Sequence, residues 1–168
     1  MKSAPSERRA RRGFDSLEQE AFLNLWRTYD RLRSLEDELF SRHELTPQQY
    51  NVLRLLRGEH PGTLPTLALA SRLVSHAPDI TRMLDKLESR GLIHRQRSPD
   101  NRRVVQVGIS PEGLSLLKKL DKPVRKCHER QLGHLSAEDL RRLVSLLEAS
   151  RKPHEQETSA WKPRPAGE

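Results

Sequence analysis

The stretch ITRMLDKLESRGLI, residues 80–93, decides the fold of this chain. Its apolar residues Ile80, Met83, Leu84 and Leu87 recur at steps of three or four, which predicts a helix with one apolar face. Gly91 suits the left-handed position that follows a helix C-terminus. The opposite face carries hydrogen-bonding and charged side chains, namely Asp79, Thr81, Arg82, Asp85, Lys86 and Glu88. This stretch therefore predicts a short helix that packs on one side and presents polar groups on the other.

A two-stranded hairpin is predicted immediately after this helix. Residues 93–98 and 104–109 both have strand character, and in the second strand Val105, Val107 and Ile109 alternate with the residues between them. The connection PDNRR, residues 99–103, combines turn-forming residues with arginines. Four arginines fall within ten residues, namely Arg95, Arg97, Arg102 and Arg103. The hairpin is therefore expected to have a basic tip.

The segments before residue 80 predict one long helix and two shorter ones. The long helix covers about residues 16–42, where apolar residues follow one stripe. Thr46-Pro47-Gln48-Gln49 forms a capping-box start for a helix that ends near Gly58. A third helix runs from Leu67 to about Val74, and residues 75–78 break the chain. The order helix, helix, tight break, helix, hairpin is that of a winged helix-turn-helix. The predicted fold class is mainly α with a small two-stranded β-wing.

Two further helices are predicted after the hairpin. Ser110-Pro111-Glu112 opens the first, in which Pro123 predicts a kink or a restart, and Ser136 opens the second. The stretches 16–42 and 112–149 contain more apolar surface than a small winged domain can bury, which predicts a homodimer. The predicted organisation is a flexible basic arm (1–13), a dimerisation helix (14–45), a winged helix-turn-helix DNA-binding domain (46–110), C-terminal dimerisation helices (111–151) and a disordered tail (152–168).

The charge of the chain favours a polyanionic partner. Its 168 residues include 31 Lys and Arg against 23 Asp and Glu, a formal net charge of +8. Residues 94–103 hold four Arg and one Asp, and residues 1–13 carry a net +4. Residues 114–151 carry a further net +4 for which the sequence gives no target.

Composition excludes several classes of protein. The longest apolar run has four residues, 67–70, so no segment can span a bilayer, and the basic N-terminus lacks the apolar stretch of a secretory signal. The single cysteine excludes a disulfide framework and a zinc finger, and fits the cytoplasm. The sequence lacks a glycine-rich phosphate loop and a nucleophile elbow, so an enzyme is not predicted. Residues 51–160 contain no aromatic side chain on which unpaired bases could stack, which disfavours RNA or single-strand binding.

The helix at residues 80–89 and the basic hairpin together favour double-stranded DNA as the partner. Such a helix can enter a major groove, while the hairpin reaches an adjacent minor groove or the backbone. The predicted recognition-helix contacts are His76, Asp79, Thr81, Arg82 and Lys86, and the predicted wing contacts are Arg95, Arg97, Arg102 and Arg103. Two alternatives stay open. The arginines can simply form a solvated surface, and the fold can serve as a protein–protein module without specific DNA binding.

The chain resembles the MarR (multiple antibiotic resistance regulator) family. The resemblance lies in LASRL (69–73), ITRMLDKLESRGLI (80–93) and SPDNRRVVQVGISPEG (98–113), and is sharpest over residues 46–120. It implies a transcription regulator that dimerises through its first and last helices. Together with the residues, it predicts a cytoplasmic, homodimeric repressor on a pseudo-palindromic operator. At the wing tip the family has aspartate, any residue, then arginine. Arg103 matches that arginine, Asn101 stands at the aspartate position, and Asp100 is a second candidate to orient the arginine.

The resemblance also implies that a small aromatic or phenolic ligand releases the DNA. Six of the seven aromatic residues lie between Phe14 and Tyr50. The predicted pocket residues are Trp26, Tyr29 and His43. The alternative, which their helical spacing favours, is that the aromatic residues form the core of a dimer interface.

No cofactor or metal is predicted. Some relatives sense oxidants through a cysteine in the first helix, whereas Cys127 lies on the same face of the fifth helix as Leu120 and Val124. It is therefore predicted to be a small buried residue rather than a redox switch. His128 and His134 are six residues apart, which does not match the i, i+4 spacing of a helical metal site.

Overall fold

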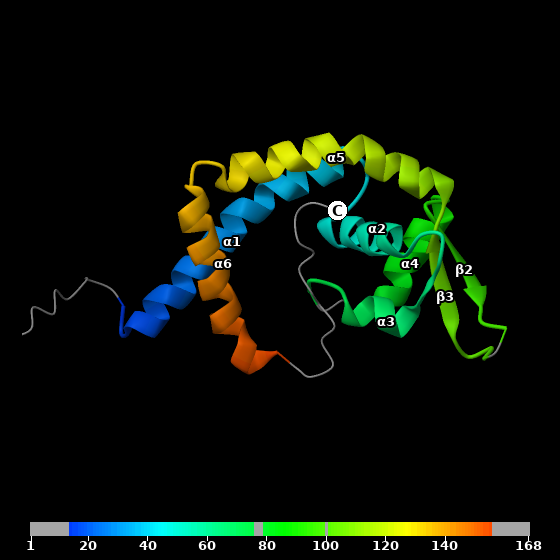
Figure 1. Ribbon diagram of the computed structural model, residues 1–168, viewed down its shortest axis with the longest axis horizontal. Helices are drawn as coiled ribbons and strands as arrows, with labels where there is room; N and C mark the ends of the chain where they lie inside the picture. Colours follow the sequence, from blue (N-terminus) through cyan, green and yellow to red (C-terminus); the bar gives the residue numbers. More distant parts are fainter. Residues whose placement is uncertain (1–13, 76–78, 100, 156–168) are drawn as a thin grey trace, which may run out of the picture.

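The computed structural model describes residues 14–75, 79–99 and 101–155. The chain is mostly helical, with a small antiparallel sheet (Figure 1). Its elements are α1 (Leu17–Ser41), α2 (Pro47–Glu59), β1 (Leu64–Pro65), α3 (Thr66–Ser71), α4 (Ile80–Ser89), β2 (Ile93–Arg97), β3 (Val105–Ile109), α5 (Pro111–Leu132), α6 (Ala137–Arg151) and a 3-10 turn (Lys152–His154). Within the described ranges, no helix is both long enough and apolar enough to cross a membrane.

The predicted helix starts are present. The Thr46 hydroxyl accepts a hydrogen bond from the Gln49 amide at 3.2 Å, and the Gln49 side chain accepts one from the Thr46 amide at 2.9 Å. This reciprocal capping box satisfies two backbone donors that the first turn of α2 would otherwise leave unpaired. At the starts of α1, α5 and α6, the hydroxyls of Ser16, Ser110 and Ser136 each accept a hydrogen bond from the amide three residues on, without the reciprocal bond. Local sequence therefore determines where these helices begin.

The sheet has three strands, not the predicted two. Its order is β1-β3-β2, with both pairs antiparallel; Leu64 pairs with Val107 and Ile93 with Ile109. The prediction missed β1 because this strand has two residues and one is Pro65, which lacks a backbone donor. Proline is tolerated at a sheet edge, where β1 lies. The hairpin formed by β2 and β3 is the wing, and β1 joins its base to α3.

Helix α3 ends at Ser71, three residues before the predicted end. The amides of Arg72 and Leu73 bond to carbonyls only three residues back, which tightens the last turn. The next amide, that of Val74, is bonded at 3.2 Å to the side-chain oxygen of Asn51 in α2. Helix α2 therefore supplies the hydrogen bond that continued helix would have supplied, and the chain turns toward α4.

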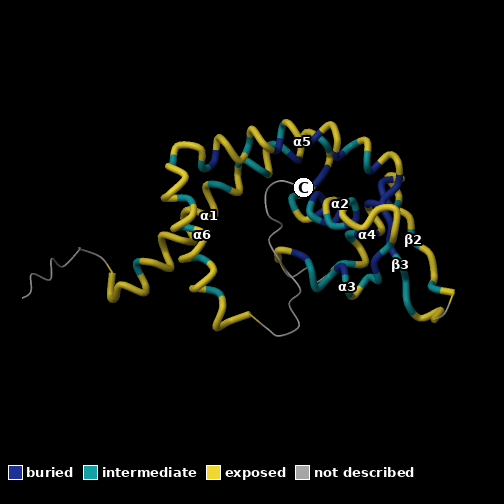
Figure 2. The backbone as a smooth tube through the Cα atoms, in the orientation of Figure 1, coloured by how far each residue is buried: buried dark blue, intermediate teal, exposed yellow. Residues whose placement is uncertain are grey.

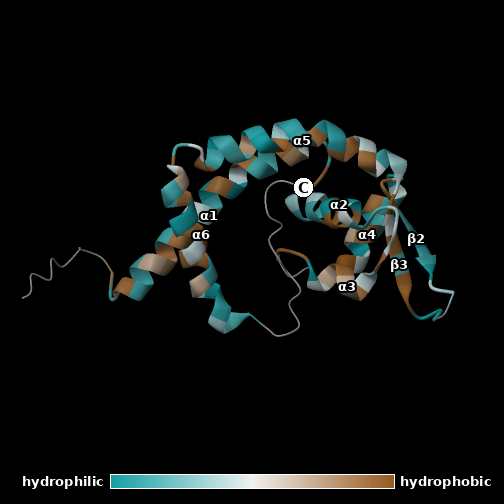
Figure 3. Cartoon of the chain, in the orientation of Figure 1, coloured by the Kyte–Doolittle hydropathy of each residue, from teal (hydrophilic) through white to brown (hydrophobic). Residues whose placement is uncertain are grey.

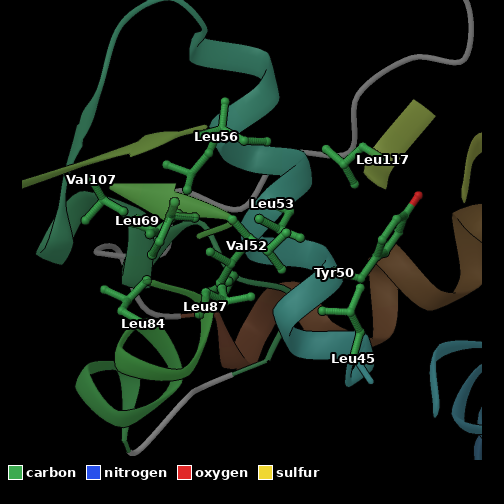
Figure 4. Packing of buried hydrophobic residues seen from close by; sticks show 14 of the residues in the cluster. Leu45, Tyr50, Val52, Leu53, Leu56, Leu69, Leu84, Leu87, Val107 and Leu117 are labelled. Carbon is green, nitrogen blue, oxygen red and sulfur yellow. The ribbon is translucent and has the colours of Figure 1, made fainter. Parts of the chain in front are cut away.

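The apolar core lies in the lobe formed by α2, α3, α4 and the sheet, and it is closed by α5. In Figure 4, Leu53 and Leu56 of α2 point into the same interior as Leu87 of α4 and Val107 of β3. At the edge of this core, the rings of Phe40 and Tyr50 stack with centroids 4.6 Å apart. The stacked pair fixes the end of α1 to the start of α2.

The long helices form the other part of the molecule. Helix α5 runs along the lobe and continues over α1, while α6 turns back from the end of α5 and crosses α1 in this view (Figure 1). Pro123 lies inside α5, which remains one helix, so the predicted alternative of a restart is wrong. A proline removes a single amide, and Leu120 and Val124 beside it are buried, so packing holds the helix together there.

The C-terminal boundary also differs from the prediction. Residues 152–154 form a 3-10 turn rather than part of a disordered tail. The Lys152 amide bonds to the Glu148 carbonyl, and Arg151 pairs with Glu155 at 2.9 Å, so the structure continues past α6. The arm at residues 1–13 and the segment 156–168 lie outside the described residues.

Candidate nucleic-acid interface

Helix α4 presents a polar outer face because its apolar residues are used for packing. Leu84 and Leu87 are fully buried, and Ile80 and Met83 are half-buried against the same core. The side chains on the remaining faces are exposed, namely Thr81, Arg82, Asp85, Lys86 and Ser89. The predicted amphipathic pattern of α4 is therefore confirmed. Its outer face carries the donors and acceptors that can meet base edges or phosphates.

The start of α4 is fixed by Asp79. Its carboxylate accepts a hydrogen bond from the Arg82 amide at 3.0 Å, which makes Asp79 the N-cap of the helix. Asp79 was predicted as a DNA contact, and its place in the structure gives it this local role. His76, the other residue predicted at this end, lies outside the described residues.

Arg95 connects the wing to α4. Its guanidinium donates from Nε to Glu88 Oε2 at 2.9 Å and from Nη2 to Asp85 Oδ1 at 2.7 Å, and its backbone amide donates to Glu88 Oε1 at 3.2 Å. The side chain is 24% exposed. Arg95 is thus held by both Asp85 and Glu88 of α4, and its predicted role as a wing contact to DNA stays a prediction.

The cluster of Arg95, Asp85 and Glu88 changes the charge of the helix surface. The Arg95 hydrogen bond lowers the pKa of Glu88 below its ordinary value, and the same contact raises the pKa of Arg95. The contact therefore favours the charged forms of Glu88 and Arg95, and the arginine offsets carboxylates that would otherwise repel a phosphate backbone. Sequence reasoning missed this pairing because the partners are seven and ten residues apart, across the turn at Gly91.

The remaining wing arginines are exposed. Arg97 ends β2, and Arg102 and Arg103 lie in the turn before β3. Within residues 14–75, 79–99 and 101–155, none of these three has an ion-pair partner. They form a group of cations at the far end of the hairpin, beyond the Arg95 cluster.

Asn101 shapes the wing tip through the backbone. Its side-chain oxygen accepts a hydrogen bond from the Arg103 amide at 3.1 Å, and its carbonyl accepts one from the Val104 amide at 2.9 Å. Asn101 thus orders the turn that carries Arg103, rather than holding the Arg103 guanidinium itself. Asp100, the second predicted orienting residue, lies outside the described residues.

Arg90 joins the C-terminal end of α4 to the turn between α1 and α2. Its guanidinium donates to the carbonyls of Glu44 and His43, at 2.5 and 3.1 Å. Glu44 adopts a left-handed conformation with φ of 53°, which turns both carbonyls toward the lobe. No local pattern around Arg90 predicts this contact, which links the long helices to the polar helix face.

The three residues predicted to line a ligand pocket are not gathered in one chain. Trp26 lines an open hollow of about 550 Å³ that is also lined by Phe14, Leu23, Asn24, Arg27 and Asp30. Tyr29 lies on α1 and is 59% exposed, whereas His43 follows the other end of that helix. At 1.5 Å per residue, Trp26 and the helix end at Ser41 are about 22 Å apart. One chain therefore does not bring the three residues together, and their predicted role in ligand binding stays a prediction.

Cys127 lies in a small hollow between α1 and α5. The hollow has a volume of about 170 Å³, and its lining includes Leu35, Leu39 and Pro123. The thiol is half-buried, not buried as predicted, and burial raises its pKa above the ordinary value. In the part of the chain that the structure describes, no three His, Cys, Asp or Glu side chains come together as metal ligands.

Comparisons with known proteins agree with this architecture. The MarR family profile matches residues 45–105. The HTH-type transcriptional regulator MhqR of Bacillus subtilis (strain 168) is 32% identical over 96 residues, which is 57% of this chain. The match covers 65% of that relative, less than two thirds of its length.

Solved structures extend the similarity over most of the chain. A MarR transcription factor from Planctomyces limnophilus is 58% identical and has a TM-score of 0.65, covering 82% of this chain and 99% of its own. A structure of BpsR from Bordetella bronchiseptica, which addresses regulation of its DNA binding by 6-hydroxynicotinic acid, has a TM-score of 0.73. At 21% identity, with 86% of this chain and 100% of that one covered, this second structure shows the fold alone.

Proposed function

Because the chain belongs to the MarR family of transcriptional regulators, we propose that it acts as a homodimeric repressor that binds a pseudo-palindromic operator in double-stranded DNA. Residues 46–110 are the DNA-binding domain of this proposal, and residues 14–45 and 111–151 supply the dimerisation helices. The observation that carries it is the pairing of an exposed polar helix face with a basic hairpin, held together by Arg95.

Helix α4 is the proposed recognition helix. Arg82 and Lys86 are one turn apart on its exposed side, and neither has an ion-pair partner among the described residues. Arginine and lysine can donate to guanine edges in the major groove, and Thr81 can pair with a base or a phosphate. Asp79 contributes by starting the helix, and Arg95 by holding the wing against it.

The wing supplies the proposed second contact. Arg97, Arg102 and Arg103 lie along an exposed hairpin that is narrow enough to follow a minor groove or the adjacent backbone. Arg103 is the proposed minor-groove contact, because Asn101 orders the turn that presents it.

The dimer is proposed from the apolar surface that one chain leaves uncovered. On α1, Phe22 and Trp26 are 61% and 62% exposed, and on α6, Val144 and Leu146 are 54% and 58% exposed. Large apolar side chains left exposed on two helices point to an interaction site. A two-fold dimer formed through it presents two α4 helices to one duplex, which explains the preference for a pseudo-palindrome.

A small aromatic or phenolic ligand is the proposed effector. The support is the regulation of BpsR DNA binding by 6-hydroxynicotinic acid, together with the hollow beside Trp26, which a second copy of the chain can close. The test is to titrate 6-hydroxynicotinic acid and simple phenols into the protein–DNA complex. Release of DNA that disappears in Trp26→Ala supports this site, provided that the variant remains a dimer. Unchanged release in that variant contradicts it.

The main test measures binding to a duplex from the gene's own upstream region and to a scrambled duplex of equal length, across a salt series. The regulator is expected to prefer the upstream duplex and to lose affinity steeply as salt rises. Arg103→Ala is expected to weaken binding to both duplexes and to reduce the salt slope by about 1. Substitution of Thr81 or Arg82 is expected to change the preference between the duplexes.

The controls for this test are chosen from the same lobe. Arg54→Ala removes an exposed cation of α2, away from the wing and α4, and is expected to leave the salt slope unchanged. Equal affinity for the two duplexes at every salt concentration contradicts a sequence-specific regulator and favours a protein–protein module. Repression itself is checked with a reporter gene behind the upstream region, whose expression should rise when the regulator is deleted.

A further inference from the structure

Helix α5 carries a row of cations that the proposed DNA contacts do not use. The row consists of Lys118, Lys119, Lys122, Arg125 and Lys126, all of them exposed, and it is named here the α5 basic face. Within the ranges that the structure describes, no ion pair involves any of the five. Asp121, the acidic residue among them, is instead bonded to Arg57 of α2 at 2.8 Å. The face therefore presents its positive charge to solvent uncompensated.

The α5 basic face is directed away from the proposed operator contacts. On a helix with 3.6 residues per turn, Lys122 falls opposite the buried residues Leu117, Leu120 and Val124. Lys118, Lys119 and Lys126 fall to either side of Lys122, and Arg125 lies at the flank. The buried side packs on α1 and α2, so the basic face is the outer surface of α5. Figures 2 and 3 show the middle of α5 as mostly exposed and hydrophilic along its outer edge, with α4 across the lobe from it and the wing extending from the lobe at the N-terminal end of α5.

The residue types on the α5 basic face indicate the chemical class of its partner. Protein–protein interfaces are depleted in lysine and rich in aromatic side chains, and a membrane-binding helix needs apolar residues beside its cations. The α5 basic face has four lysines and one arginine, and α5 has no aromatic residue on which an unpaired base could stack. Closely spaced lysines with no apolar anchor suit the phosphate backbone of a duplex, which carries about one charge per 1.7 Å of axis.

We propose that the α5 basic face binds the phosphate backbone of a second DNA duplex, without sequence preference. The proposal goes beyond operator binding by α4 and the wing, and rests on it only for the first duplex. Lys118 and Lys126 are about 12 Å apart along the helix, which is enough to follow a few successive phosphates. A dimer held on one duplex by its winged lobes then presents an α5 basic face from each copy, and can hold two DNA segments together.

The experiment captures a second duplex in two stages. A bead-bound duplex from the upstream region is first saturated with the protein, and a fluorescent scrambled duplex is then added at 50–200 mM KCl. Wild type is expected to capture the second duplex at 50 mM and to release most of it by 200 mM, because each phosphate contact adds about −0.9 to the slope of log affinity against log salt.

The decisive variant is Lys118→Gln/Lys122→Gln, with Arg141→Gln/Lys152→Gln as a control that removes two exposed cations in and just after α6. The α5 variant is expected to saturate the bead-bound duplex normally, to capture the second duplex about tenfold less well at 50 mM, and to lower its salt slope by about 1.8. The control is expected to behave as wild type. Equal capture by wild type and the α5 variant overturns the proposal, as does wild type that captures no second duplex at 50 mM.

A second experiment measures binding to the α5 basic face in solution, with a variant whose wing contacts are removed. Arg97→Ala/Arg103→Ala is expected to retain weak, salt-sensitive binding to the scrambled duplex, and adding the two α5 substitutions is expected to remove that binding.

The outcomes separate the two proposals. If the protein shows no preference for the upstream duplex in the first stage, the proposed function alone is contradicted. Residual binding that the α5 substitutions leave unchanged contradicts the second-duplex site alone. If poly-glutamate of equal charge displaces the second duplex at equal concentration, the face takes any polyanion and the assignment to DNA is overturned.

Discussion

The winged lobe and the long helices differ in how much apolar surface a single chain buries. In the lobe, Leu53, Leu84 and Val107 are at most 1% exposed. Helix α6 has no buried residue among its fifteen, all of which are described, and α1 buries only Phe40 of its twenty-five. The lobe is therefore complete in one chain, whereas the helices keep amphipathic faces that pack only partly. We infer that the lobe folds on its own contacts and that the helices are completed by a second copy.

The largest expected effect separates the two regions by stability. Leu53→Ala removes a fully buried side chain of α2 and is expected to lower the free energy of unfolding by about 2–5 kcal/mol. Leu146→Ala in α6 removes an equally large side chain that is 58% exposed within one chain. At protein concentrations low enough to favour monomer, its cost is expected to be below about 1 kcal/mol. Urea unfolding followed by circular dichroism measures both, and equal costs would contradict the comparison.

The second prediction tests what completes the helices. Trp26→Glu places a charge in the exposed apolar face of α1 and is expected to convert the dimer to a monomer with an intact lobe. Since two linked half-site contacts then become one, affinity for the upstream duplex is expected to fall about 100-fold. Light scattering after size exclusion measures the mass. The matched control is Arg33→Glu, on the same helix but on an exposed polar position. If the Trp26→Glu protein remains dimeric, the dimer interface does not lie on this face of α1.

Features set by neighbouring residues could be predicted from the sequence, whereas contacts between distant segments could not. The helix starts, the polar face of α4 and the wing strands follow from local patterns, because capping residues and periodicity act over a few residues. Strand β1 was missed because two residues, one of them Pro65, have no period to detect. The partners of Arg95 were missed because Asp85 and Glu88 come near it only after the chain turns at Gly91.

The effector site shows the limit of the sequence more sharply. Six aromatic residues in one stretch indicated a pocket, but Trp26 and His43 lie toward opposite ends of the first helix region, and one chain leaves the hollow beside Trp26 open. A pattern along one helix gives the direction of each side chain around its axis. It does not give what is packed against that side.

The third prediction concerns coupling inside the lobe. Arg95→Gln leaves Glu88 and Asp85 unpaired beside the proposed DNA surface and frees the wing from α4, so duplex affinity is expected to fall about tenfold. Arg95→Gln/Glu88→Gln is expected to recover part of the loss, because one repelling charge is gone. Fluorescence anisotropy with both duplexes measures this. Wild-type affinity in Arg95→Gln would show that the cluster does not position the wing.

The Arg95 cluster also has a defined pH dependence. Its contact lowers the pKa of Glu88, so its contribution to folding is complete above the ordinary pKa of a glutamate and is lost as the pH falls through the lowered value. Stability curves of wild type and Glu88→Gln are therefore expected to differ at neutral pH and to converge in acid. Curves that stay parallel through the acid range contradict the assigned pairing.

The fourth prediction addresses the contact between the two regions. Arg90→Met keeps the aliphatic stem but removes the donors to the carbonyls of Glu44 and His43, and is expected to cost about 1–2 kcal/mol of unfolding free energy. Duplex binding is expected to weaken as well, because α4 loses its link to the end of α1. Arg90→Lys, which keeps one charged donor, is expected to lose less on both measures. If Arg90→Met matches wild type, the contact of Arg90 with the end of α1 does not help to join the lobe to the helices.

The smallest expected effect tests whether α1 and α5 stay packed against each other around Cys127 in solution. Burial raises the pKa of the Cys127 thiol, so less thiolate is present at a given pH than for a free cysteine. Iodoacetamide is therefore expected to label Cys127 more slowly in the folded protein than in the urea-unfolded chain, and faster as the pH rises. Cys127→Ser is expected to change the unfolding free energy by less than about 1 kcal/mol, because the thiol is half-buried and fills little of the hollow beside Leu39. If Cys127 is labelled as fast in the folded protein as in the unfolded chain, α1 and α5 separate readily. The weak packing of the long helices would then reach the edge of the lobe.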